Sequence, residues 1–315
     1  MLSAKAMENY REGTEWWTHN VVAVVTGASR GLGLETVRLL ANQGLTVVLT
    51  ARNHDTGLAL ANQLGSPNVH FHQLDVQSDQ SVSQLADWLL HKFKGIDILI
   101  NNAAVNGLHI DRELWASRGI NFRMLLGNPS FTEGVSRDYQ STRTCVDTNY
   151  FGTKRMVKAM LPLLKPSTFG SRIVNVSSRA GVLKSLENEA LRMKLADIEN
   201  LREETIDAFV NNYLDDVQSG QVEGKGWPLR RSYAISKMAV NAYTRLVARD
   251  FGRHPEHHHE VYVNCVHPGF VKTDMTDQEG DLTAAEAATF VARIALFPPG
   301  GPSGHFFDKK DITSS

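Results

Sequence analysis

The sequence feature that most constrains the fold is a strand-like run followed directly by a glycine-rich turn and a helix-like segment. Residues 21–26 form a continuous apolar run rich in valine, which suits a parallel strand buried on both faces. Glycines follow in a Gly-x-x-x-Gly-x-Gly spacing over residues 27–33, and apolar residues then recur at helical spacing until Gly44, a predicted helix C-cap. Because glycines let a pyrophosphate approach the backbone and a helix N-terminus offers unpaired N–H groups, this unit predicts a dinucleotide site. A purely structural turn is the alternative.

Strand-like and helix-like segments alternate along the rest of the chain. Further apolar runs that predict strands lie at residues 46–51, 69–74, 96–100, 172–176 and 261–266. This alternation predicts an α/β fold with a doubly wound parallel sheet, the Rossmann architecture. We expect a single domain at residues 21–315, ending with an edge strand at residues 304–307. An N-terminal arm at residues 1–20 would precede it and pack on the body through Trp16 and Trp17.

Composition argues against several classes of partner and compartment. A net charge of −1 over 315 residues gives no reason to expect nucleic acid or an anionic membrane as a partner. The apolar runs are too short to span a bilayer, and the first 20 residues lack the apolar core of a secretory signal. Two cysteines, Cys145 and Cys265, do not make a disulfide framework, so a cytoplasmic protein is expected. The histidines at residues 257–259 have no accompanying acid or cysteine pattern, and no metal is expected.

The end of the second predicted strand bears on which nucleotide binds. A fold that binds NAD usually places an acid there, about twenty residues beyond the glycine turn, to hold the ribose 2′-hydroxyl. This chain has Thr50, Ala51 and Arg52 at that point. Arg52, together with Arg30 in the glycine turn, could clamp a 2′-phosphate because guanidinium matches phosphate geometry. The sequence therefore favours NADPH (NADP+), although both arginines could be ordinary surface residues.

A tyrosine and a lysine one helical turn apart are the leading candidates for chemistry. Tyr233 and Lys237 are four residues apart at the predicted start of a helix, and residues at that spacing lie on one face. A nearby ammonium lowers the pKa of a phenol from its ordinary value of about 10, so we expect Lys237 to activate Tyr233 as a proton donor. The pair alone is weak evidence because this spacing is common on helix surfaces.

An insertion at about residues 184–226 precedes this helix. Asn200 and Glu203 resemble an N-cap pair, and the acidic residues that follow lie mostly off the apolar face. The apolar face consists of Ile206, Phe209, Val210, Tyr213, Leu214 and Val217. We expect a covering helix docked on the body rather than an acidic binding patch.

Several motifs follow one another in an order typical of one enzyme family. They are the glycine turn, Asn101-Asn102-Ala103, Asn149 in a helix predicted at residues 142–164, Ser178, Tyr233-x-x-x-Lys237 and Pro268-Gly269. The ordered set resembles the short-chain dehydrogenase/reductase family from about residue 21 to residue 307. One departure is Ala104, since the family usually shows Asn-Asn-Ala-Gly.

The resemblance implies roles for individual residues. Tyr233 would donate a proton to the developing alkoxide, Ser178 would hydrogen-bond the same oxygen, and Lys237 would bind the nicotinamide ribose and depress the tyrosine pKa. Asn149 would hold a water for proton resupply. Ser178 is chosen over its neighbour because its spacing to Gly181 matches the family's Ser-x-x-Gly. The cofactor would contact Gly27, Ser29, Arg30, Gly31, Leu32, Gly33, Arg52, Asp75, Val76, Asn102, Ala103, Tyr233, Lys237, Pro268, Gly269, Val271 and Thr273.

Further sequence features resemble one subgroup of this family. The long gap between Ser178 and Tyr233 and the tripeptide at residues 226–228 look like the monomeric carbonyl reductases. Residues 293–297 and 301–304 look like the plant branch that contains salutaridine reductase and menthone reductases. This resemblance implies an NADPH-dependent carbonyl reductase of a terpenoid, an alkaloid or a reactive carbonyl. It also implies a monomer, because in that branch the insertion is thought to cover the face that other members use to oligomerise.

Two alternative functions and the substrate stay open. An ene-reductase of α,β-unsaturated carbonyls would use the same cofactor, but some plant relatives of that kind replace the tyrosine with an acid, and this chain keeps Tyr233. A non-catalytic NADPH-binding regulator would not need the complete catalytic set. Residues 105–140, the start of the insertion and residues 273–281 are expected to line the substrate pocket, the last as a polar candidate lid.

Overall fold

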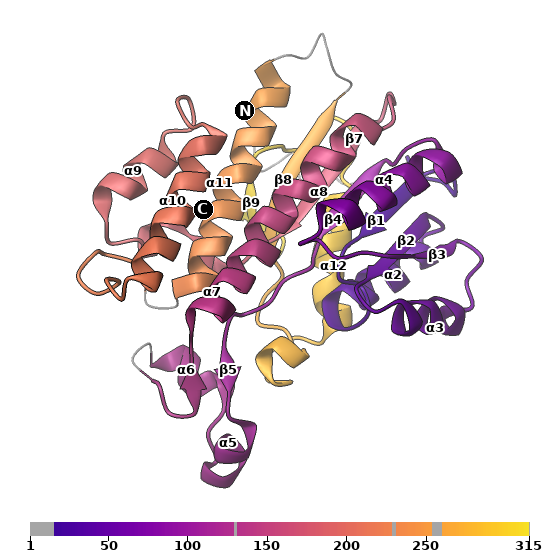
Figure 1. Ribbon diagram of the computed structural model, residues 1–315. Helices are drawn as coiled ribbons and strands as arrows, with labels where there is room; N and C mark the ends of the chain where they lie inside the picture. Colours follow the sequence, from indigo (N-terminus) through magenta and orange to yellow (C-terminus); the bar gives the residue numbers. More distant parts are fainter. Residues whose placement is uncertain (1–15, 129–130, 229–230, 254–259, 315) are drawn as a thin grey trace.

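The computed structural model describes residues 16–128, 131–228, 231–253 and 260–314, which form layers around one mainly parallel sheet (Figure 1). The sheet strands are β1 Val22–Val25, β2 Thr46–Ala51, β3 Val69–Gln73, β4 Ile98–Asn101, β7 Ser171–Val176, β8 Val261–His267, β9 Phe306–Asp308 and β10 Asp311–Thr313. Their order across the sheet is β10-β9-β8-β7-β4-β1-β2-β3. Neighbouring strands run parallel apart from the antiparallel pair β9–β10.

The strand order reverses beside β1, as it does in doubly wound sheets. β1 pairs with β2 on one side and with β4 on the other. The connections that leave these strands therefore diverge and open a crevice at their carboxyl ends, where open α/β sheets bind ligands. The predicted α/β fold with a doubly wound parallel sheet is confirmed.

Helices cover both faces of the sheet (Figure 1). On one face lie α2 Gly31–Asn42, α3 His54–Leu64 and α12 Ala284–Ala295, with α2 packed along α12. On the other lie α4 Asp79–Phe93, α7 Tyr139–Val146, α8 Gly152–Met160 and α11 Arg231–Arg253. A small ribbon, β5 His109–Ile110 with β6 Val135–Ser136, and two short helices, α5 Arg112–Arg118 and α6 Phe122–Gly127, extend beyond the carboxyl edge of the sheet.

The insertion before α11 forms α9 Glu189–Ala196 and α10 Glu203–Gln218, and α10 packs against α11 and α7. The predicted apolar face of α10 is confirmed, because Phe209 and Tyr213 are buried and pack around Trp227. A polar cluster continues this interface, in which Asp207 accepts hydrogen bonds from the Tyr150 hydroxyl at 2.7 Å and from Lys154 at 2.6 Å. The insertion is thus a covering helix, as its pattern predicts.

Three local predictions are corrected. The helix expected at residues 142–164 is divided by a π-helical turn at Asp147–Phe151, which contains Asn149 and follows from one extra residue within the turn. The helix α10 has Arg202 at its N-cap position without a side-chain cap, while Asn200 bonds Asp197 instead. The predicted edge strand β9 is covered by β10, whose sequence carries little apolar signal.

The part of the N-terminal arm that the structure describes packs on the body, as expected. Trp17 is buried in the core beneath α2 and α12. The indole N–H of Trp16 donates to the carbonyl of Leu296 at 3.2 Å, and its ring lies 3.8 Å from the buried guanidinium of Arg172.

Among all the residues that the structure describes, no helix is long and apolar enough to cross a membrane. The described chain also contains no group of three or more His, Cys, Asp and Glu side chains that could hold a metal ion, and the histidines at residues 257–259 lie outside the described residues.

Candidate active site

A cavity of about 1130 Å³ opens at the carboxyl edge of the sheet, beside the strand-order reversal. It is lined by the glycine turn, by the ends of β2, β3, β4 and β7, by α11 and by the segment that follows β8. The lining includes Gly27, Ser29, Arg30, Gly31, Leu32, Gly33, Arg52, Asp75, Val76, Asn102, Ala103, Ser178, Tyr233, Lys237, Pro268, Gly269, Val271 and Thr273. The structure therefore brings all the predicted site residues to one cavity except Asn149, which is not among its lining residues.

The glycine turn is held to the end of β4 by hydrogen bonds between side chains and backbone groups. The Asn102 amide donates to the carbonyl of Thr26 at 2.9 Å and to that of Gly27 at 3.1 Å, while the Thr26 hydroxyl accepts from the backbone N–H of Asn102 and Ala103. A side chain at Gly33 would place its Cβ only 2.5 Å from the Asn102 amide nitrogen. The turn thus leaves exposed backbone at the start of α2, which suits the pyrophosphate of a dinucleotide.

Two arginines line the cavity beside the glycine turn. Arg52 lines the cavity at the end of β2, and Arg30 lines it at the start of α2. Arg30 makes an exposed ion pair of 2.8 Å with Asp274 from the segment after β8. The residues present fit a phosphorylated dinucleotide, since they offer guanidinium groups and no acid at the end of β2.

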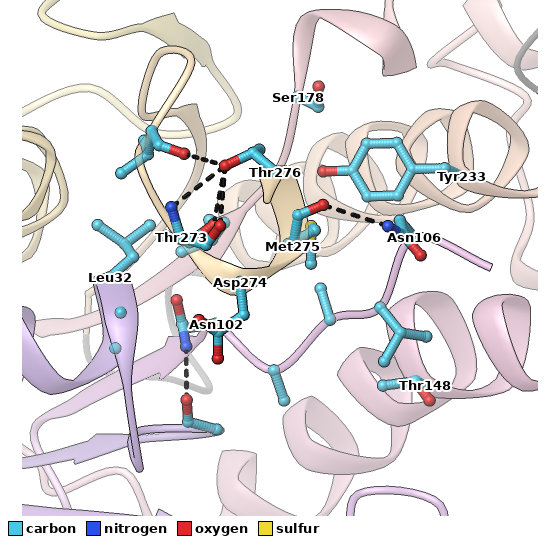
Figure 2. A pocket seen from close by; sticks show the side chains of 18 of the residues that line it. Leu32, Asn102, Asn106, Thr148, Ser178, Tyr233, Thr273, Asp274, Met275 and Thr276 are labelled. Carbon is cyan, nitrogen blue, oxygen red and sulfur yellow. Dashed lines mark hydrogen bonds between the residues drawn. The ribbon is translucent and has the colours of Figure 1, made fainter. Parts of the chain in front are cut away.

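Tyr233 and Lys237 line the cavity from the first turns of α11, as predicted. Figure 2 shows the ring of Tyr233 directed into the cavity. The Lys237 ammonium donates to the carbonyl of Val176 at 2.7 Å and lies 5.7 Å from the centre of the Tyr233 ring. Burial raises the pKa of Tyr233 to about 12, and hydrogen bonding with Ser178 offsets only part of this shift. Burial also lowers the pKa of Lys237 to about 8.

The expectation that Lys237 lowers the pKa of Tyr233 is therefore wrong for the protein without its cofactor. Desolvation of the phenolate is the largest effect on Tyr233, and Lys237 does not compensate it. The ammonium is itself buried, and it is directed to the Val176 carbonyl. The phenol consequently stays protonated at neutral pH.

Ser178 lies at the end of β7, where the chain turns towards α11. Its hydroxyl accepts from the backbone N–H of Ala180 at 3.2 Å. The neighbouring Ser177 is directed elsewhere, because its hydroxyl donates to buried Asn241 at 2.5 Å. The turn must pass close to α11, since a Cβ on Gly181 would lie 2.5 Å from the backbone of Lys237. This close approach gives a physical reason for the Ser-x-x-Gly spacing.

Asn149 is fully buried in the π-helical turn. Its side-chain oxygen accepts from the backbone N–H of Val105 at 2.9 Å, and its amide nitrogen donates to the Val105 carbonyl at 2.9 Å and to the Ser236 hydroxyl at 3.0 Å. The side chain therefore connects the loop after β4 to α11, next to Tyr233.

The other half of the cavity combines apolar side chains with polar ones such as Asn106, His109, Arg112 and Arg137. As predicted, residues 105–140 and the segment from residue 273 contribute to it. The apolar members are Leu108, Ile110, Phe122, Leu125, Leu126, Phe270 and Met275. The start of the insertion was also expected there, but none of the described residues of the insertion lines the cavity. The individual side chains were missed, although Phe122, Leu125 and Leu126 have helical spacing that could have indicated one face.

The segment at residues 273–281 is anchored by its polar side chains. Thr273 and Thr276 form a capping box around a short 3-10 turn, Asp274–Thr276. The Asn106 amide donates to the Met275 carbonyl at 3.2 Å, which joins the loop after β4 to this segment across the cavity (Figure 2). The segment thus lies over the cavity near Tyr233.

Comparisons with known proteins agree with this geometry. The chain matches the family model described as short chain dehydrogenase over residues 21–190 and 217–283. It is 41% identical to (+)-neomenthol dehydrogenase of Arabidopsis thaliana over 92% of this chain and 97% of that protein. It is 33% identical to carbonyl reductase [NADPH] 1 of Rattus norvegicus over 92% of this chain and 97% of that protein.

A solved structure shows the same likeness in three dimensions. The structure of salutaridine reductase from Papaver somniferum superimposes with a TM-score of 0.84 at 39% identity, covering 91% of this chain and 99% of that one. The chain therefore belongs to the short-chain dehydrogenase family, in the branch that contains the plant salutaridine and menthone reductases.

Proposed function

We propose that the protein uses NADPH to reduce the carbonyl group of a ketone or aldehyde, such as a terpenoid, an alkaloid or a reactive carbonyl, to an alcohol. Family membership makes it an oxidoreductase that acts on CH–OH and C=O groups with a nicotinamide cofactor. The observation that carries the proposal is the meeting of Ser178, Tyr233 and Lys237 in the cavity that the glycine turn borders. The apolar side chains in the half of the cavity beyond Tyr233 suit the hydrocarbon part of such a substrate.

The preference for NADPH rests on Arg30 and Arg52. Both line the cavity, Arg30 in the glycine turn and Arg52 at the end of β2, and the end of this strand is where related folds hold the ribose that carries the 2′-phosphate. A relative at 33% identity carries NADPH in its name, which agrees with this choice. When bound, the cofactor supplies the hydride that reaches the carbonyl carbon.

The phenol of Tyr233 is the proposed proton donor. Its pKa, raised by burial to about 12, keeps it protonated at neutral pH, and the developing alkoxide is basic enough to take this proton. Ser178 hydrogen-bonds the same oxygen and holds the carbonyl towards Tyr233. Both side chains project from regular elements or their ends, β7 and α11, so their separation is set by the core.

Lys237 and Asn149 complete the proposed catalytic set. Lys237 is placed to bind the nicotinamide ribose, while its bond to Val176 ties α11 to the end of β7. For Asn149 the family resemblance implies a bound water for proton resupply. Its contacts with Val105 and Ser236 support a second contribution, in which it fixes the loop that borders Tyr233.

The test is NADPH consumption over a panel of cyclic terpenoid ketones, alkaloid ketones, aromatic aldehydes and quinones. We expect turnover with NADPH that is much slower with NADH. The Tyr233→Phe variant should lose turnover and keep the NADPH affinity of the wild type, because the ring remains and only the proton donor is removed. Undiminished turnover by Tyr233→Phe would refute the assigned proton donor, and tight NADPH binding without turnover on any carbonyl would support a regulator instead.

We also propose that the protein is a cytoplasmic monomer with one domain at residues 21–315 and an arm at residues 1–20. The helix α10 covers α11 and α7, so their outer faces are buried within one chain. The two cysteines are buried and unpaired, which suits a reducing compartment. Light scattering after gel filtration should give the mass of one chain, 34.9 kDa.

A further inference from the structure

The segment after β8 contacts α5 and α6, which form part of the cavity wall, through acidic side chains. Glu279 lies on this segment, and its carboxylate reaches the N-terminus of α6. One oxygen accepts from the backbone N–H of Phe122 at 2.8 Å, and the other accepts from that of Arg123 at 3.2 Å. These contacts join parts of the chain that are more than 150 residues apart.

The two contacts matter because the first N–H groups of a helix have no partner within the helix. In α6 the side chain of Asn121 accepts only from the N–H of Met124, at 3.0 Å. Glu279 therefore takes the two N–H groups that this cap leaves. Hydrogen bonds to an ionised carboxylate are stronger than those between neutral groups, and α6 is too short to be stable alone.

The helix that Glu279 holds is part of the cavity wall. Phe122, Leu125 and Leu126 of α6 line the cavity, whereas Glu279 itself does not. The ring of Phe122 also stacks on Phe270 with 6.3 Å between the ring centres. A shift of α6 would therefore move apolar surface on the substrate side. It would leave Ser178 and Tyr233 in place, since Ser178 follows β7 and Tyr233 lies in α11.

The two ends of the segment that carries Glu279 are joined to each other by backbone hydrogen bonds. The backbone N–H of Asp281 donates to the carbonyl of Phe270 at 2.8 Å, and that of Lys272 donates to the carbonyl of Leu282 at 2.8 Å. Two ion pairs also join the segment to the wall, Arg112 with Asp277 and Arg123 with Asp281. Both pairs are largely exposed, so each contributes little to stability.

We propose that Glu279 is a positioning residue that determines how tightly the substrate is held, by fixing α6 against the cavity. It acts on the substrate-binding wall and not on the proton transfer. The kinetic part of this inference rests on the proposed carbonyl reduction, whereas the effect on α6 does not.

The variant that tests the proposal is Glu279→Gln, which keeps the size of the side chain and removes its charge. We expect the KM for a carbonyl substrate to rise about tenfold, in keeping with the loss of a charge-assisted hydrogen bond, while kcat and the dissociation constant of NADPH change less than about twofold. Hydrogen–deuterium exchange at residues 122–127 should become at least several-fold faster.

Two control variants separate this role from general stabilisation. Glu286 caps its own helix, α12, through a local capping box in which it accepts from the backbone N–H of Thr283 at 2.8 Å, and it does not line the cavity. Glu286→Gln should leave the KM and the exchange of α6 unchanged. Asp281→Asn removes the ion pair with Arg123 and keeps both the Glu279 contacts and the packing of Arg123 on the Phe270 ring, so its KM should stay close to that of the wild type.

The outcomes are distinguishable. An unchanged KM and unchanged exchange in Glu279→Gln would overturn the proposal, and so would an equal rise of KM in Glu286→Gln or Asp281→Asn. If the wild-type protein reduces no carbonyl, the proposed function is refuted, but the proposed contact of Glu279 with α6 is not. Exchange at residues 122–127 then still decides whether Glu279 holds α6.

Discussion

The ammonium of Lys237 lies 5.7 Å from the centre of the Tyr233 ring and donates a 2.7 Å hydrogen bond to the carbonyl of Val176. This bond ties the start of α11 to the end of β7, two residues before Ser178. The lysine thereby adds a buried polar contact to the core packing that sets the separation between the elements carrying the serine and the tyrosine.

Ser178→Ala tests whether the serine holds the carbonyl oxygen. Removing one hydrogen-bond donor to a developing oxyanion costs about 10²–10³-fold in kcat, and we expect a loss of that size here. NADPH affinity, measured by fluorescence titration, should not change. Ser185→Ala is the matched control, because the Ser185 hydroxyl bonds the Val182 carbonyl outside the cavity. A kcat near the wild-type value in Ser178→Ala would exclude this role.

Arg52→Asp tests the choice of nucleotide. The substitution removes a guanidinium from the cavity and introduces the acid that a fold binding NAD has at the end of the second strand. Loss of a charge-assisted contact with the 2′-phosphate should raise the dissociation constant of NADPH by about tenfold or more, and NADH should bind more tightly than to the wild type. An equal loss of affinity for NADPH and NADH would show that Arg52 does not contact the 2′-phosphate.

Acid should destabilise the fold through His267, at the end of β8. Burial lowers the pKa of His267 to about 4 from its ordinary 6.5. Between these values the unfolded chain binds a proton that the folded chain does not, so the free energy of unfolding falls as pH falls from 6.5 towards 4. The loss is at most about 3 kcal/mol. Urea unfolding at several pH values should show that the free energy of unfolding falls less steeply with falling pH in His267→Gln than in the wild type. Parallel plots of this free energy against pH for the two proteins would contradict the assignment to His267.

Phe209→Ala tests the packing of the insertion. Phe209 is buried on α10, with its ring centre 5.6 Å from that of Trp227. Truncating a buried phenylalanine costs about 3–5 kcal/mol of stability, which thermal unfolding would detect as a lower Tm. Because the described residues of the insertion do not line the cavity, kcat at a permissive temperature should stay near the wild-type value. A large loss of kcat in folded protein would place α10 closer to the chemistry.

The parts of the site that the sequence could predict are those with a local signal. The glycine turn is recognisable because a strand precedes it and a helix follows it, and Tyr233 and Lys237 share a helix face by spacing alone. The apolar face of α10 is similarly visible in the period of Ile206, Phe209 and Tyr213.

Features that depend on distant residues could not be predicted in this way. The contacts of Glu279 with α6 and of Asn149 with Val105 join segments far apart in the chain, and no local pattern encodes them. The raised pKa of Tyr233 has the same cause, because it depends on burial by the assembled fold, which the spacing of Tyr233 and Lys237 does not report. The short strand β10 gives too weak a pattern over Asp311–Thr313 to be seen.

The most direct test of the central claim is to analyse the product formed from a cyclic conjugated enone with NADPH that carries deuterium at the transferred position. Carbonyl reduction through Tyr233 predicts an allylic alcohol with deuterium on the carbinol carbon, and no such product from Tyr233→Phe. A saturated ketone with deuterium on the β-carbon would contradict the account and show that the protein reduces the conjugated double bond instead.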